Sequence, residues 1–378
     1  MMRGAVLRPP WIWRRFLTVL TLAGALAGAA AAQGLQAMAY FPWWVPQSWR
    51  SAPLAELDRL LFFEFRIAPD GTIAERHGWP TEWAALCAEA ARSKVPIDVV
   101  LTLFDPAEFR TLFRTEAARA RLLDETLSLS HAKETAGVHL DIEIFEVQDA
   151  AIVAGYRAFV RTLAQRLRSQ GKALSVFLPA GEGTALYDPA TLALAEYVVV
   201  QGYDTHYRAS RRAGPVAPLD GPDSWTWAKA VEAATALGLP AQRIVMGFPL
   251  YGYEWGVRDA PPRSEVIRPA DTTTFAAVPE DWLPELRISV AERVQRYGAT
   301  HDPVTGSSYY KFRNDAGQWR EGWFEDWWSL GRKYGFVAQR GLGGMAFFLL
   351  GYDRHALLSA YVQRRSMDNL DGLIERLR

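Results

Sequence analysis

Short apolar runs that alternate with helical patterns are the feature of this sequence that most restricts its fold. Eight such runs follow one another, and each has the length and composition of a β-strand. They lie at residues 35–41, 58–65, 95–104, 136–145, 172–180, 195–204, 243–253 and 341–353. Strands that alternate with helices form parallel sheets, and eight such units over 378 residues predict an α/β fold, the closed (β/α)8 TIM barrel.

One interval between these runs is too long for a single strand-to-helix connection. It extends from Gly256 to about Gly335 and contains "SSYYKFRNDAGQWREGW", which reads as a hairpin turning at "NDAG". The helical pattern "DWWSLGRKYGFVAQR" follows it. We therefore expect a small α+β insertion at about residues 256–335, between strands seven and eight of one domain that spans residues 33–378.

The first 32 residues have the pattern of a signal peptide. Four arginines come before the apolar run "FLTVLTLAGALAGAAAA", and small residues suited to cleavage lie near Ala32. The alternative is a permanent membrane anchor, which so short an Ala- and Gly-rich run disfavours. We expect export to the periplasm or beyond the cell, with no stable membrane insertion after cleavage.

Charge and cysteine content limit the partners of this chain. Removing residues 1–32 takes away four arginines and no acidic residue, which leaves 38 basic and 42 acidic side chains. A nucleic-acid partner would call for a basic surface and is not expected. Cys87 is the single cysteine, lies in a helical pattern and is interpreted as a small core residue. No metal-ligand spacing is present, and we expect neither a metal nor a cofactor.

The fourth run, "GVHLDIEIFE" at residues 137–146, places His139, Asp141 and Glu143 at every second position. Alternate side chains of a strand share one face, so the three ionisable groups face one way and the apolar residues between them the other. In a barrel the apolar face packs on the helices and the polar row points to the axis. Glu143 then lies nearest the carboxyl end of the strand, where barrel active sites lie.

Two carboxyl groups so placed are expected to share protons. Like charges at close range do not ionise independently, so one of the pair Asp141 and Glu143 holds a proton near neutral pH and is suited to general acid catalysis.

Several segments together resemble glycoside hydrolase family 18, the family of chitinases and related N-acetylglucosaminidases. "GVHLDIE" is similar to its strand-four pattern Asp-Gly-x-Asp-x-Asp-x-Glu, with Gly137, Asp141 and Glu143 matching. "QGYD", "MGFPLYGYEW" and "RGLGGMAFFLLGYD" resemble its strands six, seven and eight, and "MAYFPWW" and "FEFRIAPDG" its strands one and two. The resemblance covers residues 36–355, and "GFPLYGYEW" is similar to the branch that cleaves peptidoglycan, including cortical-fragment hydrolases of spore formers.

The resemblance implies a mechanism in which the substrate assists. Glu143 protonates the leaving oxygen, and the acetamido oxygen of the sugar attacks its own anomeric carbon. Asp141 accepts the acetamido N–H, while Tyr203 holds the acetamido carbonyl and Asp204 helps to position the group. Aromatic residues stack on sugar faces, and the implied substrate-binding residues are Tyr40, Phe65, His139, Tyr251 and Phe347.

Other interpretations of the same residues remain open. Glu143 also fits a salt bridge or cap at a strand end, Tyr203 and Asp204 fit barrel-rim structure, and the aromatic residues fit core packing. His139 stands where the family has Asp, and it is either a core histidine satisfied by Asp141 or a catalytic base. If His139 were protonated, its positive charge would lower the pKa of Asp141.

The departures from the family pattern concern specificity more than fold. Ala136 also replaces an Asp, Phe347 stands about where a Trp is usual, and Tyr253 stands where many chitinases have Arg. "LTLFDPAEF" replaces the Ser-x-Gly-Gly of strand three. We expect an exported retaining glycosidase acting on an N-acetylglucosamine-containing polymer, with peptidoglycan or exopolysaccharide favoured over chitin. The alternative is a sugar-binding protein of the same fold with little or no turnover.

Overall fold

Eight parallel strands close into a barrel, as the strand–helix alternation predicts. The computed structural model describes residues 34–276, 286 and 288–377. The barrel strands are β1 (Gln36–Pro42), β2 (Arg59–Arg66), β3 (Ile97–Leu103), β4 (Thr135–Ile142), β5 (Ala173–Leu178), β6 (Val198–Val200), β7 (Ile244–Pro249) and β14 (Gly344–Phe348). Each pairs with its neighbour along the chain, and β14 closes the sheet by pairing with both β1 and β7. The TIM-barrel prediction is confirmed. The predicted signal peptide, residues 1–32, lies outside the described residues.

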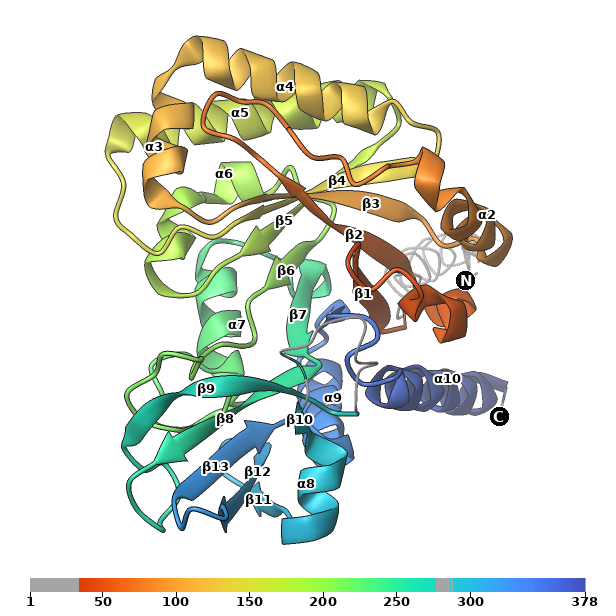
Figure 1. Cartoon of the computed structure of the whole chain (residues 1–378). Coiled ribbons are helices and arrows are strands. Elements are labelled where there is room, and N and C mark those ends of the chain that lie inside the picture. Colours follow the sequence, from red (N-terminus) through yellow and green to blue (C-terminus); the bar gives the residue numbers. More distant parts are fainter. Residues whose placement is uncertain (1–33, 277–285, 287, 378) are drawn as a thin grey trace, which may run out of the picture. The chain divides into compact units, whose positions relative to one another are not determined.

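Helices cover the outside of the strands (Figure 1). The α-helices are α2 (Ala84–Ser93), α3 (Pro106–Arg114), α4 (Glu116–Ser130), α5 (Ala150–Ser169), α6 (Pro189–Leu192), α7 (Trp227–Ala236), α8 (Val290–Tyr297), α9 (Trp327–Gln339) and α10 (Ala356–Leu377). Short 3-10 turns are η1 (Ser48–Ser51), η2 (Leu54–Glu56), η3 (Thr81–Trp83), η4 (Gly181–Leu186) and η5 (Ala241–Arg243). The helical stretch expected around 107–132 is two helices, because the chain is extended at Thr115. Asp105 begins the first by accepting hydrogen bonds from two backbone N–H groups, as N-cap residues do.

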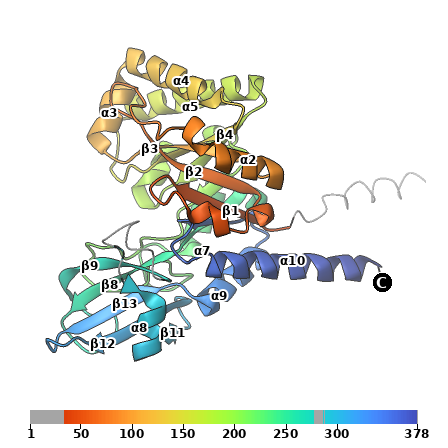
Figure 2. The same cartoon turned by 45° about the vertical axis from the view of Figure 1, so that its right-hand side comes forward.

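A second, six-stranded sheet is inserted between β7 and β14 (Figures 1 and 2). It consists of β8 (Tyr251–Val257), β9 (Val266–Thr274), β10 (Ile288–Ser289), β11 (Thr300–Asp302), β12 (Ser307–Arg313) and β13 (Trp319–Phe324). β12 and β13 form the hairpin expected at "NDAG". The seventh run is divided between the sheets, since β7 ends at Pro249 and Tyr251 already begins β8.

The interior of the barrel contains a paired polar layer. The buried carboxylate of Asp98 accepts hydrogen bonds from Arg59 (2.8 Å) and from the hydroxyl of Tyr197 (2.9 Å). Burial raises the pKa of Asp98, while the Arg59 charge acts in the opposite direction. Because its partners are present, this charge is tolerated at the core.

Two glycines let β6 and β7 approach each other beside Tyr203. A Cβ atom at Gly202 would lie 2.2 Å from the carbonyl oxygen of Gly247, and one at Gly247 would lie 2.8 Å from the ring of Tyr203. Any larger side chain would therefore displace the segment that carries Tyr203 and Asp204.

Candidate active site at the carboxyl ends of the strands

The polar row of β4 points into the barrel. His139 is 0% exposed and Asp141 is 3% exposed, and Glu143 follows directly after the strand ends at Ile142. The backbone N–H of Glu143 still donates to the carbonyl of Leu103 on β3 (3.1 Å), so the residue keeps the direction of the strand. Val138, Leu140 and Ile142 are buried on the other face of β4.

His139 belongs to the barrel core and not to a binding surface. Its Nε2 lies 3.0 Å from the hydroxyl of Tyr40 and its Nδ1 lies 2.8 Å from the hydroxyl of Ser175. Burial, with the Arg59 charge, lowers the pKa of His139 to about 3, so the ring is neutral at physiological pH. The structure thus corrects the substrate-binding prediction for His139, and its partners are Tyr40 and Ser175 where Asp141 was expected.

Asp141 and Glu143 form a pair of carboxyl groups with raised pKa values. Burial, followed by the negative charge of Glu64, raises the pKa of Asp141 to about 8. One of its oxygens, Oδ1, is buried and has no hydrogen-bond partner among the residues that the structure describes. Burial and the charges of Asp141 and Asp204 raise the pKa of Glu143 well above its usual value. A carboxyl group that keeps its proton near neutral pH is suited to general acid catalysis.

Glu143 forms part of the wall of a cavity of about 740 Å³ at the carboxyl ends of β4, β5 and β6. Further lining residues are Phe145, Ala180, Gly181, Glu182, Gln201, Tyr203, Asp204, Thr205, Tyr207, Arg208, Ser224, Trp225 and Tyr253. The cavity thus brings Glu143, Tyr203 and Asp204 together from two segments 60 residues apart along the chain. Phe145 and Tyr207 are 50% and 51% exposed, so the rim presents aromatic surface to solvent.

Asp204 is held in place by two tyrosines of the second sheet. Its Oδ1 accepts hydrogen bonds from the hydroxyls of Tyr251 (2.7 Å) and Tyr253 (3.2 Å). Burial raises the pKa of Asp204 to about 6, and both hydrogen bonds act to lower it. The second sheet therefore completes a site that the barrel alone would leave open.

The aromatic residue of β14 that faces this region is Phe348. Its ring centroid lies 5.4 Å from that of Tyr40, 5.6 Å from that of Tyr203 and 6.2 Å from that of Tyr251. Phe347 is 0% exposed and packs outside the barrel against Phe248 and Tyr361. Phe347, predicted as a substrate-binding residue, thus lies on the outer face of β14, and alternation along the strand places Phe348 on the inner face.

Two other predicted substrate-binding residues, Tyr40 and Phe65, also lie away from the cavity. Tyr40 is fully buried, and its hydroxyl is engaged by His139. Phe65 is fully buried against Phe62. The pairing of β2 with β3 shifts between Phe62 and Phe65, so a strict period of two does not hold there.

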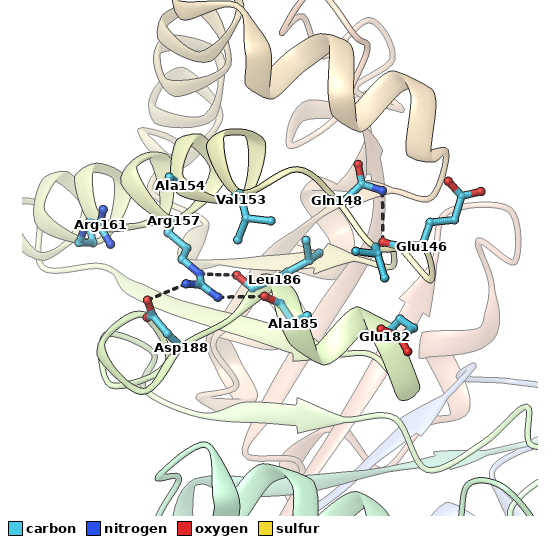
Figure 3. Close-up of a pocket in the computed structure, with 12 residues that line it drawn as sticks. Glu146, Gln148, Val153, Ala154, Arg157, Arg161, Glu182, Ala185, Leu186 and Asp188 are labelled. Atoms are coloured by element: carbon cyan, nitrogen blue, oxygen red, sulfur yellow. Dashed lines mark hydrogen bonds and ion pairs between the residues drawn. The ribbon is translucent and has the colours of Figure 1, made fainter.

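A second hollow of about 440 Å³ adjoins the cavity and shares Glu182 with it. It lies between α5 and η4, where Arg157 donates to the carbonyl oxygens of Leu186 (2.9 Å) and Ala185 (2.9 Å) and pairs with Asp188 (Figure 3). These contacts fix η4, and with it the cavity wall at residues 180–182.

The sequence interpretation missed several residues of the site. Glu64, Gln201, Trp225 and Phe348 were not singled out. Trp225 donates from Nε1 to the carbonyl of Gln201 (2.9 Å), and Gln201 accepts from the backbone N–H of Ala180 (2.7 Å). The alternation of β14 could have indicated Phe348, whereas no local pattern marks the other three.

Within residues 34–276, 286 and 288–377, no cluster of three or more His, Cys, Asp or Glu side chains has the arrangement of a metal site. The helices in this part of the chain are also too short or too polar to cross a membrane.

Comparison with known proteins gives consistent matches. The family model described as "Glycosyl hydrolases family 18" matches residues 42–353. YdhD of Bacillus subtilis (strain 168) is 27% identical over 289 residues, which cover 73% of this chain and 62% of that protein. A cortical fragment-lytic enzyme of Bacillus anthracis is 22% identical over 309 residues, covering 78% and 65%. The chain thus spans less than two thirds of the length of these curated relatives.

A solved structure shares the fold. It is the family GH18 chitinase from Cycas revoluta in complex with (GlcNAc)3, which superposes with a TM-score of 0.70 at 19% identity. The match covers 87% of this chain and 99% of the chitinase.

Proposed function

The chain belongs to family 18 of the glycosyl hydrolases, and on this premise we propose that it is an exported retaining glycosidase. Its substrate is a polysaccharide that contains N-acetylhexosamine, and the acetamido group of the substrate takes part in the reaction. The observation that carries the proposal is the carboxyl pair at the end of β4. Glu143 forms part of the cavity wall with a raised pKa, and Asp141 lies buried two residues before it.

In the first step, Glu143 donates its proton to the glycosidic oxygen as the bond to the anomeric carbon breaks. The acetamido oxygen of the same sugar attacks the anomeric carbon from the opposite side and forms a cyclic oxazolinium ion. Asp141 accepts a hydrogen bond from the acetamido N–H and stabilises the positive charge that develops. Tyr203, part of the same cavity wall, donates its hydroxyl to the acetamido carbonyl, and Asp204 helps to hold the group.

In the second step, the ionised Glu143 takes a proton from a water molecule. The water oxygen attacks the anomeric carbon and opens the oxazolinium ring, which restores the acetamido group. Two inversions at this carbon give net retention of configuration. The rate gain comes from orientation, because the nucleophile is already part of the bound sugar. It also comes from carboxylates fixed where positive charge appears.

The polymer that we propose is bacterial peptidoglycan or a related exopolysaccharide. Support comes from the relatives, among which the protein of Bacillus anthracis carries the name cortical fragment-lytic enzyme. Tyr253 also lines the cavity where many chitinases have Arg, and its hydroxyl is used by Asp204. Export is proposed from the basic and apolar pattern of residues 1–32.

Replacing the acid tests the proposal. We expect Glu143→Gln to lower kcat on purified peptidoglycan or on N-acetylglucosamine oligomers by about 10²–10⁴-fold with binding retained, because a Gln has no proton to donate. Product mass spectrometry measures cleavage and identifies the linkage. Glu146→Gln is the control, since Glu146 is exposed and pairs with Arg110. Equal turnover by wild type and Glu143→Gln would refute the assignment of the acid.

A second candidate function is sugar binding without turnover. The observation that favours it is His139, which stays neutral and is hydrogen-bonded at both ring nitrogens, so it cannot receive a proton from Asp141. Binding of the oligomers by wild type and by Glu143→Gln, with no product from either, would establish this second function and reject the first.

A further inference from the structure

Glu64 is a carboxyl group of the site region that has no role in the proposed mechanism. It lies on β2, half-buried, and its Oε2 accepts a hydrogen bond of 2.7 Å from the hydroxyl of Thr102. Thr102 is fully buried on β3 and stands in register with Asp141 on β4. The β2 residue in register with Thr102 is Arg66, and Glu64 reaches Thr102 through its side chain from beside the register shift of β2. Neighbouring strands lie about 4.8 Å apart, so Thr102 connects Glu64 on β2 with Asp141 on β4.

The surroundings of Glu64 do not suggest a role in an ion pair. Among the residues that the structure describes, its carboxylate forms no ion pair with a Lys, Arg or His, whereas Asp98 on the neighbouring strand β3 pairs with Arg59. Arg66, two positions along the same strand, pairs with Glu108 on α3 instead. A negative charge near Asp141 without a compensating cation costs stability, and such uncompensated charges cluster at functional sites.

His139 stands two residues before Asp141, where the family pattern has an Asp, and its neutral ring adds no negative charge beside Asp141. It cannot provide a negative charge, and both of its ring nitrogens are engaged by Tyr40 and Ser175. Any negative charge that adds to burial in keeping a proton on Asp141 therefore comes from another strand.

The groups that act on Asp141 and Glu143 come from four directions. On β4 itself they act on each other, and Asp204 acts on Glu143 from the segment after β6. Tyr40 on β1 and Tyr203 after β6 are neutral, since burial raises their pKa values well above 10. The positive charge of Arg59 on β2 helps to lower the pKa of His139. After burial, the charge of Glu64 is what raises the pKa of Asp141.

We propose that Glu64 is a positioning residue of this site: its carboxylate, fixed by Thr102 on the strand beside Asp141, supplies the negative charge that keeps one proton on the Asp141–Glu143 pair. This inference rests on the proposed function for its catalytic consequence. The shared proton is on Glu143 when the glycosidic oxygen needs it, and Asp141 is then the anion that meets the acetamido N–H. Glu64 itself makes no contact with the sugar.

The first test measures the proton directly and needs no substrate. In protein labelled with ¹³C at aspartate side-chain carboxyls, the Asp141 signal is assigned by its loss in Asp141→Asn. Wild-type Asp141 is expected to titrate near pH 8. Glu64→Gln keeps an oxygen to accept from Thr102 but removes the charge, and we expect the midpoint to fall by about one pH unit. An unchanged midpoint overturns the proposal.

The second test uses the pH dependence of kcat/KM. The alkaline limb reports the loss of the shared proton, and in Glu64→Gln it is expected to move to lower pH by about one unit, with KM little changed. Thr102→Val removes the hydrogen bond to the Glu64 side chain and is expected to move the alkaline limb to lower pH by less than Glu64→Gln does. Glu108→Gln, a carboxylate of α3 paired with Arg66, is the matched control and leaves the limb in place. An alkaline limb that does not move in Glu64→Gln refutes the proposal.

The two tests separate the possible failures. A wild-type protein that cleaves no polymer would reject the proposed function, while the ¹³C titration would still decide the role of Glu64. A loss of thermal stability in Glu64→Gln, with both the midpoint and the limb unchanged, would assign Glu64 a purely structural role and overturn the proposal.

Discussion

At the scale of single residues, Asp141 makes the folded protein dependent on pH. Its folded pKa of about 8 lies above the ordinary value of 3.8, so the folded state binds more protons than the unfolded chain between these values. The free energy of unfolding therefore falls as pH rises from about 4 to 8. We expect Asp141→Asn to remove most of this fall and to be more stable than wild type at pH 8, because the neutral amide carries no charge to bury. Urea unfolding at pH 4, 6 and 8 measures the difference.

Asp70→Asn is the control for this measurement. Asp70 is exposed, and hydrogen bonds from Thr72 lower its pKa, so its ionisation does not destabilise the folded state over this range. Parallel pH profiles for wild type and Asp141→Asn would contradict the prediction. An Asp141→Asn variant that is stabler and less active would show that this carboxyl is retained for function at a cost in stability.

At the scale of elements, β14 places two neighbouring phenylalanines on opposite faces. Phe347 packs among helices and strands outside the barrel, and Phe348 packs on Tyr40, Tyr203 and Tyr251 at the site. We expect Phe347→Ala to lower the free energy of unfolding by about 3–5 kcal/mol with KM unchanged. Phe348→Ala, which removes a half-buried ring, is expected to cost less stability and to raise KM. Denaturant unfolding and steady-state kinetics on the same preparations measure both.

This pair of variants is its own control, since the same atoms are removed at adjacent positions. A rise in KM for Phe347→Ala alone would return the site assignment to Phe347.

The shifted register of β2 likewise separates the surroundings of Phe63 and Phe65. Phe63 contacts Tyr40 and Phe348, whereas Phe65 packs against Phe62.

At the scale of the whole molecule, the second sheet holds the loop between β6 and α7 in place. Arg263, between β8 and β9, makes two hydrogen bonds to Asp223 of this loop (2.8 and 2.9 Å), and its backbone N–H donates to Glu321 on β13. The same loop contributes Tyr207, Arg208, Ser224 and Trp225 to the cavity wall. The sheet thus positions part of a site that lies at the mouth of the barrel.

Arg263→Met tests this coupling. We expect it to raise KM and to speed hydrogen exchange at residues 205–225, because nearly buried Asp223 loses its partner, with about 2 kcal/mol lost from the free energy of unfolding. Arg258→Met is the control, since Arg258 and Glu265 form an exposed pair on the same part of the sheet, and such pairs contribute little. Unchanged exchange in the loop of Arg263→Met would show that the sheet does not support the cavity wall.

The barrel, the inserted sheet with its hairpin, and the carboxyl row of β4 could all be predicted from the sequence. Each of these is written in a local pattern: the alternation of apolar runs with helices, the turn "NDAG", and the period of two along one strand. Such patterns involve residues close together in the sequence, so they can be recognised without knowledge of the packing.

The residues that surround Asp141 and Glu143 could not be predicted in the same way, because they come from distant parts of the chain. Glu64 and Thr102 are 38 residues apart, and Thr102 is 39 residues from Asp141, yet in the barrel Thr102 donates a hydrogen bond to Glu64 and pairs in register with Asp141. The partners of His139, Tyr40 and Ser175, follow from the same closure. The physical reason is that register between strands, and the burial that shifts a pKa, are properties of packing between distant segments, for which no local signal exists in the chain.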